Sequence, residues 1–164
     1  MFSLRGDGVG RDEKAAFEYF SEAARREHLG ALYNLGYCYE KGVGCEADIK
    51  RARSCYERAA KGGQASAQYA YATFFENGAT GEKNVDKAVL WYERAAKNGS
   101  TAAMVALGVL YGAKGDREKA NTQFKRAADA GDETGMYNYG CMLRSEGDAV
   151  GARDAFSSAA NKGY

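Results

Sequence analysis

Carboxylate and amide side chains recur along the chain at a spacing that either metal binding or helix capping could use. Successive members are separated by 36, 36, 32 and 32 residues: Asp12, Asp48, Asn84, Asp116 and Asp148. Such side chains ligate metal ions, and they also accept hydrogen bonds from the free amides at a helix start. Because each one stands singly ahead of a helical apolar pattern, we interpret the set as helix N-caps.

Other groups that could carry catalysis are scarce. His28 is the only histidine, and we expect it solvated in a turn. The glycines Gly6, Gly8 and Gly10 are spaced like a phosphate-binding loop, but no strand precedes them and their copy at Gly42 is a turn between helices. We therefore expect no catalytic residue, no cofactor and no metal, and the protein is not predicted to be an enzyme. A robust hydrolase activity abolished by His28→Ala would contradict this.

The four cysteines form neither a metal-binding nor a disulfide pattern. Cys38, Cys45, Cys55 and Cys141 include no CxxC pair. We expect Cys38 and Cys55 to be buried on helices and Cys45 to lie in a turn. Reduced thiols, together with a start (MFSLRGDG) that lacks the apolar core of a signal peptide, predict a cytoplasmic protein.

Charge and hydropathy exclude two classes of partner. The chain has 23 basic and 22 acidic residues and a formal charge of +1, so no strong field attracts nucleic acid or anionic lipid. No apolar run reaches the length of a membrane span. We expect a protein partner, without nucleic acid and without membrane insertion.

The stretch from Asn84 to Gly99 predicts one complete helix that would position a capping residue. Asn84 suits the N-cap, and Gly99 can adopt the left-handed conformation at the C-terminal end. Apolar residues three or four positions apart form one stripe: Val85, Ala88, Trp91 or Tyr92, Ala95 and Ala96. We expect Tyr92 to be buried.

Near copies of this helix follow the other capping residues. Each has an aromatic residue eight positions after the cap and an Ala-Ala pair soon after; the aromatic residues are Phe20, Tyr56, Tyr92, Phe124 and Phe156. A second helix precedes each of the last four copies, and in it large and small residues alternate, as at Leu35-Gly36. This alternation predicts close antiparallel contact, and two helices per period of 32 to 36 residues are typical of an α-solenoid.

The segment ALYNLGYCYEKGVGCEADIKRARSCYERAAKGG, from Ala31 to Gly63, carries all these positions. It resembles the Sel-one-like repeat, a relative of the tetratricopeptide repeat, and the resemblance covers essentially the whole chain. The last two repeats depart from it, because they lack the Gly-x-Gly-Val turn. The resemblance implies an all-α fold, a right-handed α-solenoid of stacked antiparallel helix hairpins. We divide the single repeat domain, 1–164, into a truncated repeat (1–29) and repeats over 30–65, 66–101, 102–133 and 134–164.

The two ends lack the polar caps that solenoids normally carry. Met1 to Arg5 aligns with the tail of a truncated first helix, and the C-terminus coincides with a repeat boundary. We therefore expect either a fragment of a longer repeat array or ends that partners cover.

One face of the first helices carries side chains suited to peptide binding. This candidate concave face consists of Tyr33, Asn34, Tyr37, Tyr69, Thr73, Val105, Tyr137 and Asn138. Tyrosine offers a large contact area, and asparagine can both donate and accept hydrogen bonds. The alternative is that these residues only stabilise the stack.

The resemblance implies a non-enzymatic scaffold or adaptor that binds a partner segment on this face. The alternative is a structural subunit built permanently into a large multi-protein assembly, for example a cytoskeletal or organellar one. The number and stoichiometry of co-purifying proteins would discriminate between the two functions.

Overall fold

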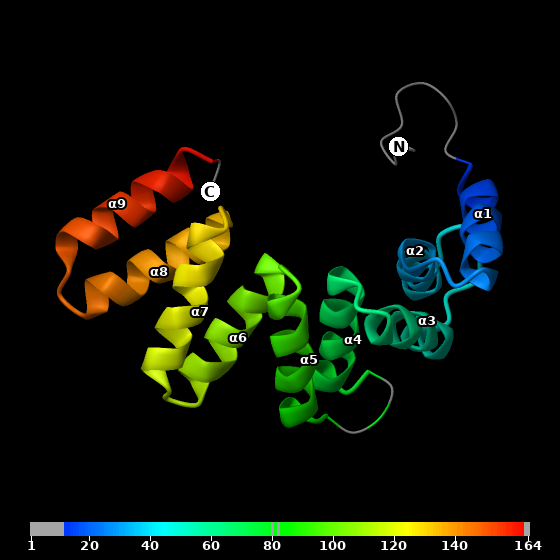
Figure 1. The fold of residues 1–164 in the computed structure, drawn as a ribbon, viewed down its shortest axis with the longest axis horizontal. Coiled ribbons are helices and arrows are strands. Elements are labelled where there is room, and N and C mark those ends of the chain that lie inside the picture. Colours follow the sequence, from blue (N-terminus) through cyan, green and yellow to red (C-terminus); the bar gives the residue numbers. More distant parts are fainter. Residues whose placement is uncertain (1–11, 80, 82, 163–164) are drawn as a thin grey trace. The chain divides into compact units, whose positions relative to one another are not determined.

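Helices of nearly uniform length account for most of the described backbone. The computed structural model describes residues 12–79, 81 and 83–162, and within them the chain forms nine α-helices and no strand (Figure 1). The bounds are α1 Glu13–Arg25, α2 Leu29–Lys41, α3 Ile49–Lys61, α4 Ala65–Asn77, α5 Val85–Lys97, α6 Thr101–Ala113, α7 Arg117–Asp129, α8 Glu133–Ser145 and α9 Ala149–Ala160. The predicted all-α class is confirmed.

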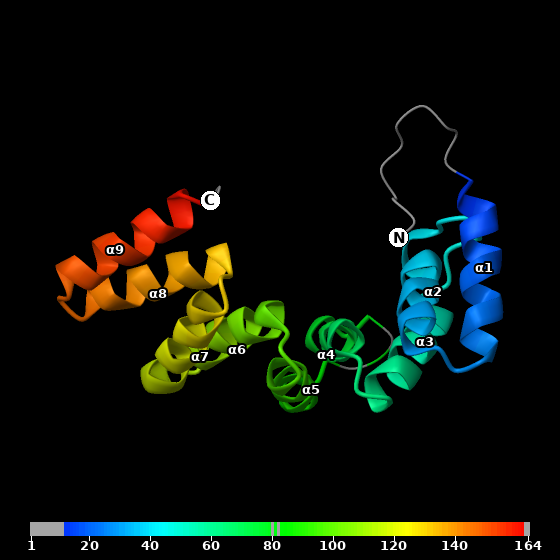
Figure 2. The same ribbon diagram turned by 45° about the horizontal axis from the view of Figure 1, so that its top comes forward.

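Two kinds of helix alternate. We call α2, α4, α6 and α8 the A helices, and α1, α3, α5, α7 and α9 the B helices. Within a unit, an A helix is followed by an antiparallel B helix that packs against it: α2 with α3, α6 with α7, and α8 with α9. The last pair lies side by side in Figures 1 and 2. The predicted helix over Asn84 to Gly99 corresponds to α5, and Gly99 has the expected positive φ of 89°.

The recurring carboxylates and amide cap the B helices, as predicted. Each side chain accepts a hydrogen bond of 2.9 to 3.1 Å from a backbone amide in the first turn: Asp12, Asp48, Asn84, Asp116 and Asp148. Their interpretation as N-caps is therefore confirmed.

The A helices have caps that the sequence pattern did not reveal, because the residue type differs at every one. The capping side chains are His28, Gln64, Ser100 and Asp132. His28 is exposed, as expected, and its Nδ1 accepts from the Ala31 amide at 3.1 Å. The only histidine therefore has a structural task at the start of α2.

One recurring contact in the core packs an aromatic residue of a B helix against a very small residue of an A helix. Tyr56 and Tyr92 are 1% exposed. A Cβ added at Gly36 would lie 2.8 Å from the Tyr56 ring, and one added at Gly108 would lie 2.4 Å from the Phe124 ring. Only glycine permits this approach, which confirms the predicted role of the alternating large and small residues.

The chain divides into two compact units, residues 1–83 and 84–164. Unit 1 contains α1 to α4 and unit 2 contains α5 to α9. Residues 1–5, predicted to be a helix tail, and the glycines at 6, 8 and 10 lie outside the described residues. The division of 1–164 into one domain with repeats at the boundaries given above stays a prediction.

Cations tie successive B helices together within each unit. Arg58 of α3 forms an ion pair with Glu27, just after α1. In unit 2, Arg126 Nη2 donates to the Ala96 carbonyl at 3.4 Å, and Lys162 Nζ donates to the Gly131 carbonyl at 3.1 Å. Every acceptor stands near the C-terminal end of the preceding B helix, where the helix dipole favours a positive charge.

Candidate protein-binding surface

In unit 1 the structure brings three predicted tyrosines of the A helices together. Tyr33 and Tyr37 lie one turn apart on α2, and Tyr69 lies on α4. Burial raises the pKa of the Tyr33 hydroxyl, and the neighbouring Glu40, Tyr37 and Tyr69 raise it further. Tyr37 remains 43% exposed. These three side chains form what we call the tyrosine face of unit 1.

The tyrosine face is continuous with the core. The rings of Tyr33 and Tyr56 are 5.7 Å apart, and those of Tyr56 and Phe74 are 5.9 Å apart. The Tyr56 hydroxyl donates to Glu40 Oε2 at 2.9 Å, which satisfies a polar group on a residue that is only 1% exposed. Tyr33 therefore stabilises the stack with one side of its ring and keeps the other side half-exposed, so the two interpretations of the tyrosines are compatible.

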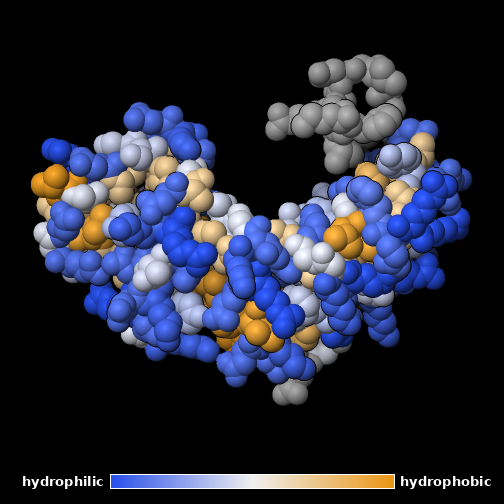
Figure 3. All heavy atoms as spheres, in the orientation of Figure 1, coloured by the Kyte–Doolittle hydropathy of each residue, from blue (hydrophilic) through white to orange (hydrophobic). Residues whose placement is uncertain are grey.

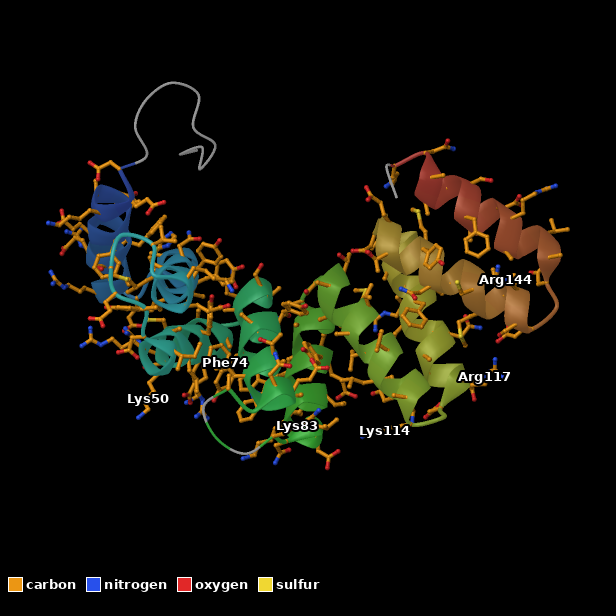
Figure 4. The ribbon with its side chains drawn as sticks, turned by 180° about the vertical axis from the view of Figure 1, so that it is seen from behind. Lys50, Phe74, Lys83, Lys114, Arg117 and Arg144 are labelled. Atoms are coloured by element: carbon orange, nitrogen blue, oxygen red, sulfur yellow. The ribbon has the colours of Figure 1, made fainter. Side chains whose placement is uncertain are left out.

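Unit 2 presents a different set of side chains at the corresponding positions. Val105 is half-buried on α6, while Val109, one turn further along, is 54% exposed. On α8, Tyr137 is 39% exposed and its ring lies 5.6 Å from that of Phe156. The guanidinium of Arg144 lies 5.6 Å from the centre of the same Phe156 ring (Figure 4). The A helices of unit 2 therefore carry exposed apolar side chains together with the positive charge of Arg144.

Two polar side chains of the predicted set form hydrogen bonds within their own helices. The Thr73 hydroxyl donates to the Ala70 carbonyl at 2.7 Å, and Asn138 Nδ2 donates to the Thr134 carbonyl at 2.8 Å. Asn34 lies half-buried beside Tyr33.

One hollow of unit 1 lies among α1, α2 and α3 and has a volume of about 760 Å³. Its three arginines each lie in an ion pair: Arg25 with Glu22, which also lines the hollow, and Arg51 and Arg58 with Asp48 and Glu27, which do not. The hollow contains neither a histidine nor a cysteine. Its side chains do not form a nucleophile with an adjacent base.

The thiols show no sign of activation. Cys38 and Cys55 are buried as expected, and burial raises the pKa of the Cys38 thiol to about 11. A thiol with a raised pKa stays protonated and is a poor nucleophile. Over the described part of the chain, His, Cys, Asp and Glu side chains do not gather in threes as a metal site requires.

Figure 3 shows mostly hydrophilic residues on the face in view of either unit, with hydrophobic residues in separate small groups. Among the described helices, none is both long enough and apolar enough to cross a bilayer. The exposed residues of the A helices stay a predicted recognition surface. Helices that are already packed can bind a partner without a large ordering cost.

The fold and this surface define a repeat protein built of stacked helix hairpins. Comparison with family models identifies the repeat: the Sel1 repeat model matches residues 1–28, 30–64, 65–100 and 101–132. The chain therefore belongs to the Sel1 repeat family, as its resemblance predicted. The search of curated proteins returned no match.

Solved structures with the same fold support this assignment. A Sel1 repeat protein from Oxalobacter formigenes is 26% identical with a TM-score of 0.91, and the match covers 96% of this chain and 67% of that one. The protective antigen c5321 of uropathogenic Escherichia coli, which displays an SLR fold, is 28% identical with a TM-score of 0.87; the match covers 98% of this chain but only 36% of that one. The immunity protein Pa5087 of Pseudomonas aeruginosa is 21% identical with a TM-score of 0.67, over 95% of this chain and 61% of that one, and shares the fold alone.

Sequence reasoning missed the charged residues at the ends of the A helices. Glu40 and Arg144 occupy equivalent positions, twelve residues after the caps His28 and Asp132. Each lies next to the core ring of the following B helix. In the sequence they differ from other residues only in that this position of the repeat is negative in one copy and positive in another. Taken alone, each resembles an ordinary charged surface residue.

Proposed function

We propose that this chain is a non-enzymatic interaction scaffold that binds a segment of a partner protein on the exposed face of its A helices. Membership of the Sel1 repeat family supports an interaction role. One observation carries the choice of surface: Tyr37, Val109 and Tyr137 are large apolar residues on A helices, and they are 43%, 54% and 39% exposed. Exposed aromatic and apolar side chains held on rigid helices are typical of binding surfaces.

In unit 1 the proposed face comprises the predicted residues Tyr33, Asn34, Tyr37, Tyr69 and Thr73. In unit 2 it comprises the predicted residues Val105, Tyr137 and Asn138 together with Val109. Binding would require little reordering, because the helices that carry these side chains are already packed. We place the protein in the cytoplasm; its four free cysteines support this, since such an environment keeps thiols reduced.

Affinity purification from the native cell, with matched surface variants, tests the proposal. We expect Tyr37→Ala and Val109→Ala to reduce the recovery of a specific co-purifying protein. Tyr19→Ala is the matched control, because Tyr19 is 64% exposed but lies on the B helix α1. Recovery that is unchanged by the A-helix variants and lost with the control would assign binding to the B helices instead.

A permanent subunit of a large assembly is the second candidate function. It is favoured by exposed apolar side chains on the B helices as well, namely Tyr19, Ile49, Leu90 and Val150. A protein covered on both sides would co-purify with a fixed stoichiometric set of components. A scaffold would instead yield a few substoichiometric partners, and its recovery of them would fall with rising salt.

A further inference from the structure

One arginine of unit 1 has no anionic partner. The other arginines among the described residues of this unit all form ion pairs: Arg25 and Arg26 with Glu22, Arg51 with Asp48, and Arg58 with Glu27. The guanidinium of Arg53, on α3, forms neither an ion pair nor a hydrogen bond with the residues that the structure describes. Its Nε is shielded from solvent without an acceptor, whereas its Nη groups still reach solvent. These Nη groups are therefore available to an anion from outside the chain.

Two aromatic rings of α4 hold this guanidinium in place. Its central carbon lies 5.4 Å from the centre of the Phe75 ring and 5.9 Å from the centre of the Tyr71 ring. The two rings are 5.0 Å apart at an angle of 76°. Tyr71 is buried, so the support belongs to the core of unit 1. A guanidinium on a ring face keeps its N–H groups free in its own plane, and a side chain held in this way loses little freedom when it binds an anion.

Packing at this position of the repeat does not require a charge. The residue five positions after the N-cap is Arg53 in α3, Phe17 in α1 and Val89 in α5. The Phe17 ring lies 5.5 Å from the ring of Tyr39, which occupies the same position of the A helix as Phe75. An apolar side chain thus forms the equivalent contact between helices elsewhere in unit 1. The arginine adds a charge that this packing does not use.

A second unpaired cation lies beside Arg53 on α3. Lys50, one turn earlier, is exposed, and its side chain forms no ion pair with the described residues (Figure 4). Glu57, one turn after Arg53, is instead paired with Lys61 at 2.7 Å. Residues three apart are neighbours on the surface of a helix, so Lys50 and Arg53 can face the same anionic segment.

We propose that Arg53 and Lys50 form a second binding site on unit 1, which takes a carboxylate-bearing segment of a protein. The two Nη groups of Arg53 donate to the two oxygens of a carboxylate, and Lys50 attracts a neighbouring acidic side chain. Carboxylate suits the site better than phosphate, because one planar fork matches two oxygens, and the formal charge of +1 gives no field that attracts nucleic acid. The site goes beyond the proposed function, since it involves the B helix α3 and no residue of the tyrosine face.

Fluorescence anisotropy with labelled peptides tests the inference on the full chain at low salt. The probe carries glutamate at every third position in a Gly-Ser background, and the matched peptide carries glutamine at those positions. We expect the glutamate peptide to bind about tenfold more tightly than the glutamine peptide. A labelled oligouridine of similar length serves as the phosphate-bearing competitor and should bind more weakly than the glutamate peptide.

Variants locate the binding. Arg53→Val introduces the side chain that α5 has at this position, and it should weaken the glutamate peptide about tenfold. Arg53→Lys keeps the charge but not the planar fork, and should weaken it several-fold. The matched control is Arg26→Gln, which removes an exposed arginine of the same unit and should leave binding unchanged. Thermal melting verifies folding, and Arg53→Val should melt no lower than the unaltered protein, because an apolar residue packs there without a shielded charge.

Equal affinity for the glutamate and glutamine peptides would overturn the inference, as would glutamate binding that survives Arg53→Val. A loss with Arg26→Gln as large as that with Arg53→Val would also overturn it, since net charge rather than this site would then explain binding. Tighter binding of the oligouridine would assign the two cations to phosphate instead. The affinity purification with A-helix variants tests the proposed function on other residues, so either result can fail without the other.

Discussion

In both units a charged residue at the end of an A helix meets an aromatic residue of the following B helix, and its charge is negative in unit 1 and positive in unit 2. In unit 1, Glu40 at the end of α2 accepts a hydrogen bond from the Tyr56 hydroxyl at 2.9 Å. In unit 2, Arg144 at the end of α8 lies 5.6 Å from the centre of the Phe156 ring. A tyrosine needs an acceptor for its buried hydroxyl, whereas a phenylalanine offers only its ring face, which attracts a cation. In these two hairpins the sign of the charge at the end of the A helix matches the kind of ring that it meets.

The largest expected effect is on the free energy of unfolding when each of these two rings is removed, because the rings differ in burial. Tyr56→Ala should lower the free energy of unfolding by about 3–5 kcal/mol, because the ring is 1% exposed and its removal leaves a cavity. Phe156 is only half-buried, so Phe156→Ala should cost less than half as much. Chemical denaturation of both variants measures the difference, and equal losses would contradict the comparison.

The next effect tests the hydrogen bond in unit 1. Glu40→Ala should cost about 1–3 kcal/mol, since the buried Tyr56 hydroxyl loses its acceptor. In the Tyr56→Phe background the same change should cost much less, because no hydroxyl remains to be satisfied. A double-mutant cycle by urea denaturation gives the coupling energy, and strictly additive losses would show that the pair is not coupled.

Alkaline pH should also distinguish Tyr56, which has a titratable hydroxyl, from Phe156, which has none. Burial, followed by the Glu40 hydrogen bond and charge, raises the pKa of Tyr56 well above its ordinary value of 10.0. The folded state therefore holds this proton to higher pH than the unfolded state, and the free energy of unfolding should fall as pH rises above about 10. Burial and Glu93 also raise the pKa of Tyr111 in unit 2, to about 12, so part of the fall comes from there.

Tyr56→Phe should make the alkaline loss of stability shallower, whereas Phe156 has no proton to lose and its replacement by leucine should leave the slope unchanged. Denaturation midpoints measured between neutral pH and pH about 11 check both expectations. A slope that Tyr56→Phe does not alter would mean that other groups dominate the alkaline transition.

The smallest effect concerns the turn after α1, where glutamate replaces the glycine of the later repeats. Glu27, after α1, has a φ of 57°, and it is the one non-glycine residue with positive φ among those described; Gly131, after α7, stands at the same position of the repeat. Glu27→Gly should raise stability by up to about 1 kcal/mol, because the left-handed strain exceeds the small contribution of the exposed Arg58 ion pair. Thermal melting measures the gain, with Gly131→Ala as the opposite change.

Much of the fold could be predicted because the repeat places one residue type at one structural position. Asp48 and Asn84 cap helices, Gly36 faces a ring, and Tyr92 is buried, as the spacing predicts. Of the two candidates for the stripe, Tyr92 is in the core, and Trp91 is half-buried beneath the Arg94 guanidinium.

The candidate site was harder to predict because its informative residues vary between repeats. The residue at the end of the A helix is Glu40 in one repeat and Arg144 in another, so it does not form a column of one type. Its meaning depends on the ring that it meets on the following helix, a contact sixteen residues away in the case of Tyr56. The same holds for His28, whose capping role has no counterpart of the same residue type in later repeats.

The cations that tie successive B helices have a consequence for biosynthesis. Arg58, Arg126 and Lys162 each reach back to an acceptor some thirty residues earlier in the chain, near the end of the preceding B helix. Each new hairpin can therefore complete its contacts with chain that the ribosome has already released. Within a unit we expect folding to proceed from the N-terminal side as the chain emerges, so stalled nascent chains that end after a complete hairpin should already resist proteolysis.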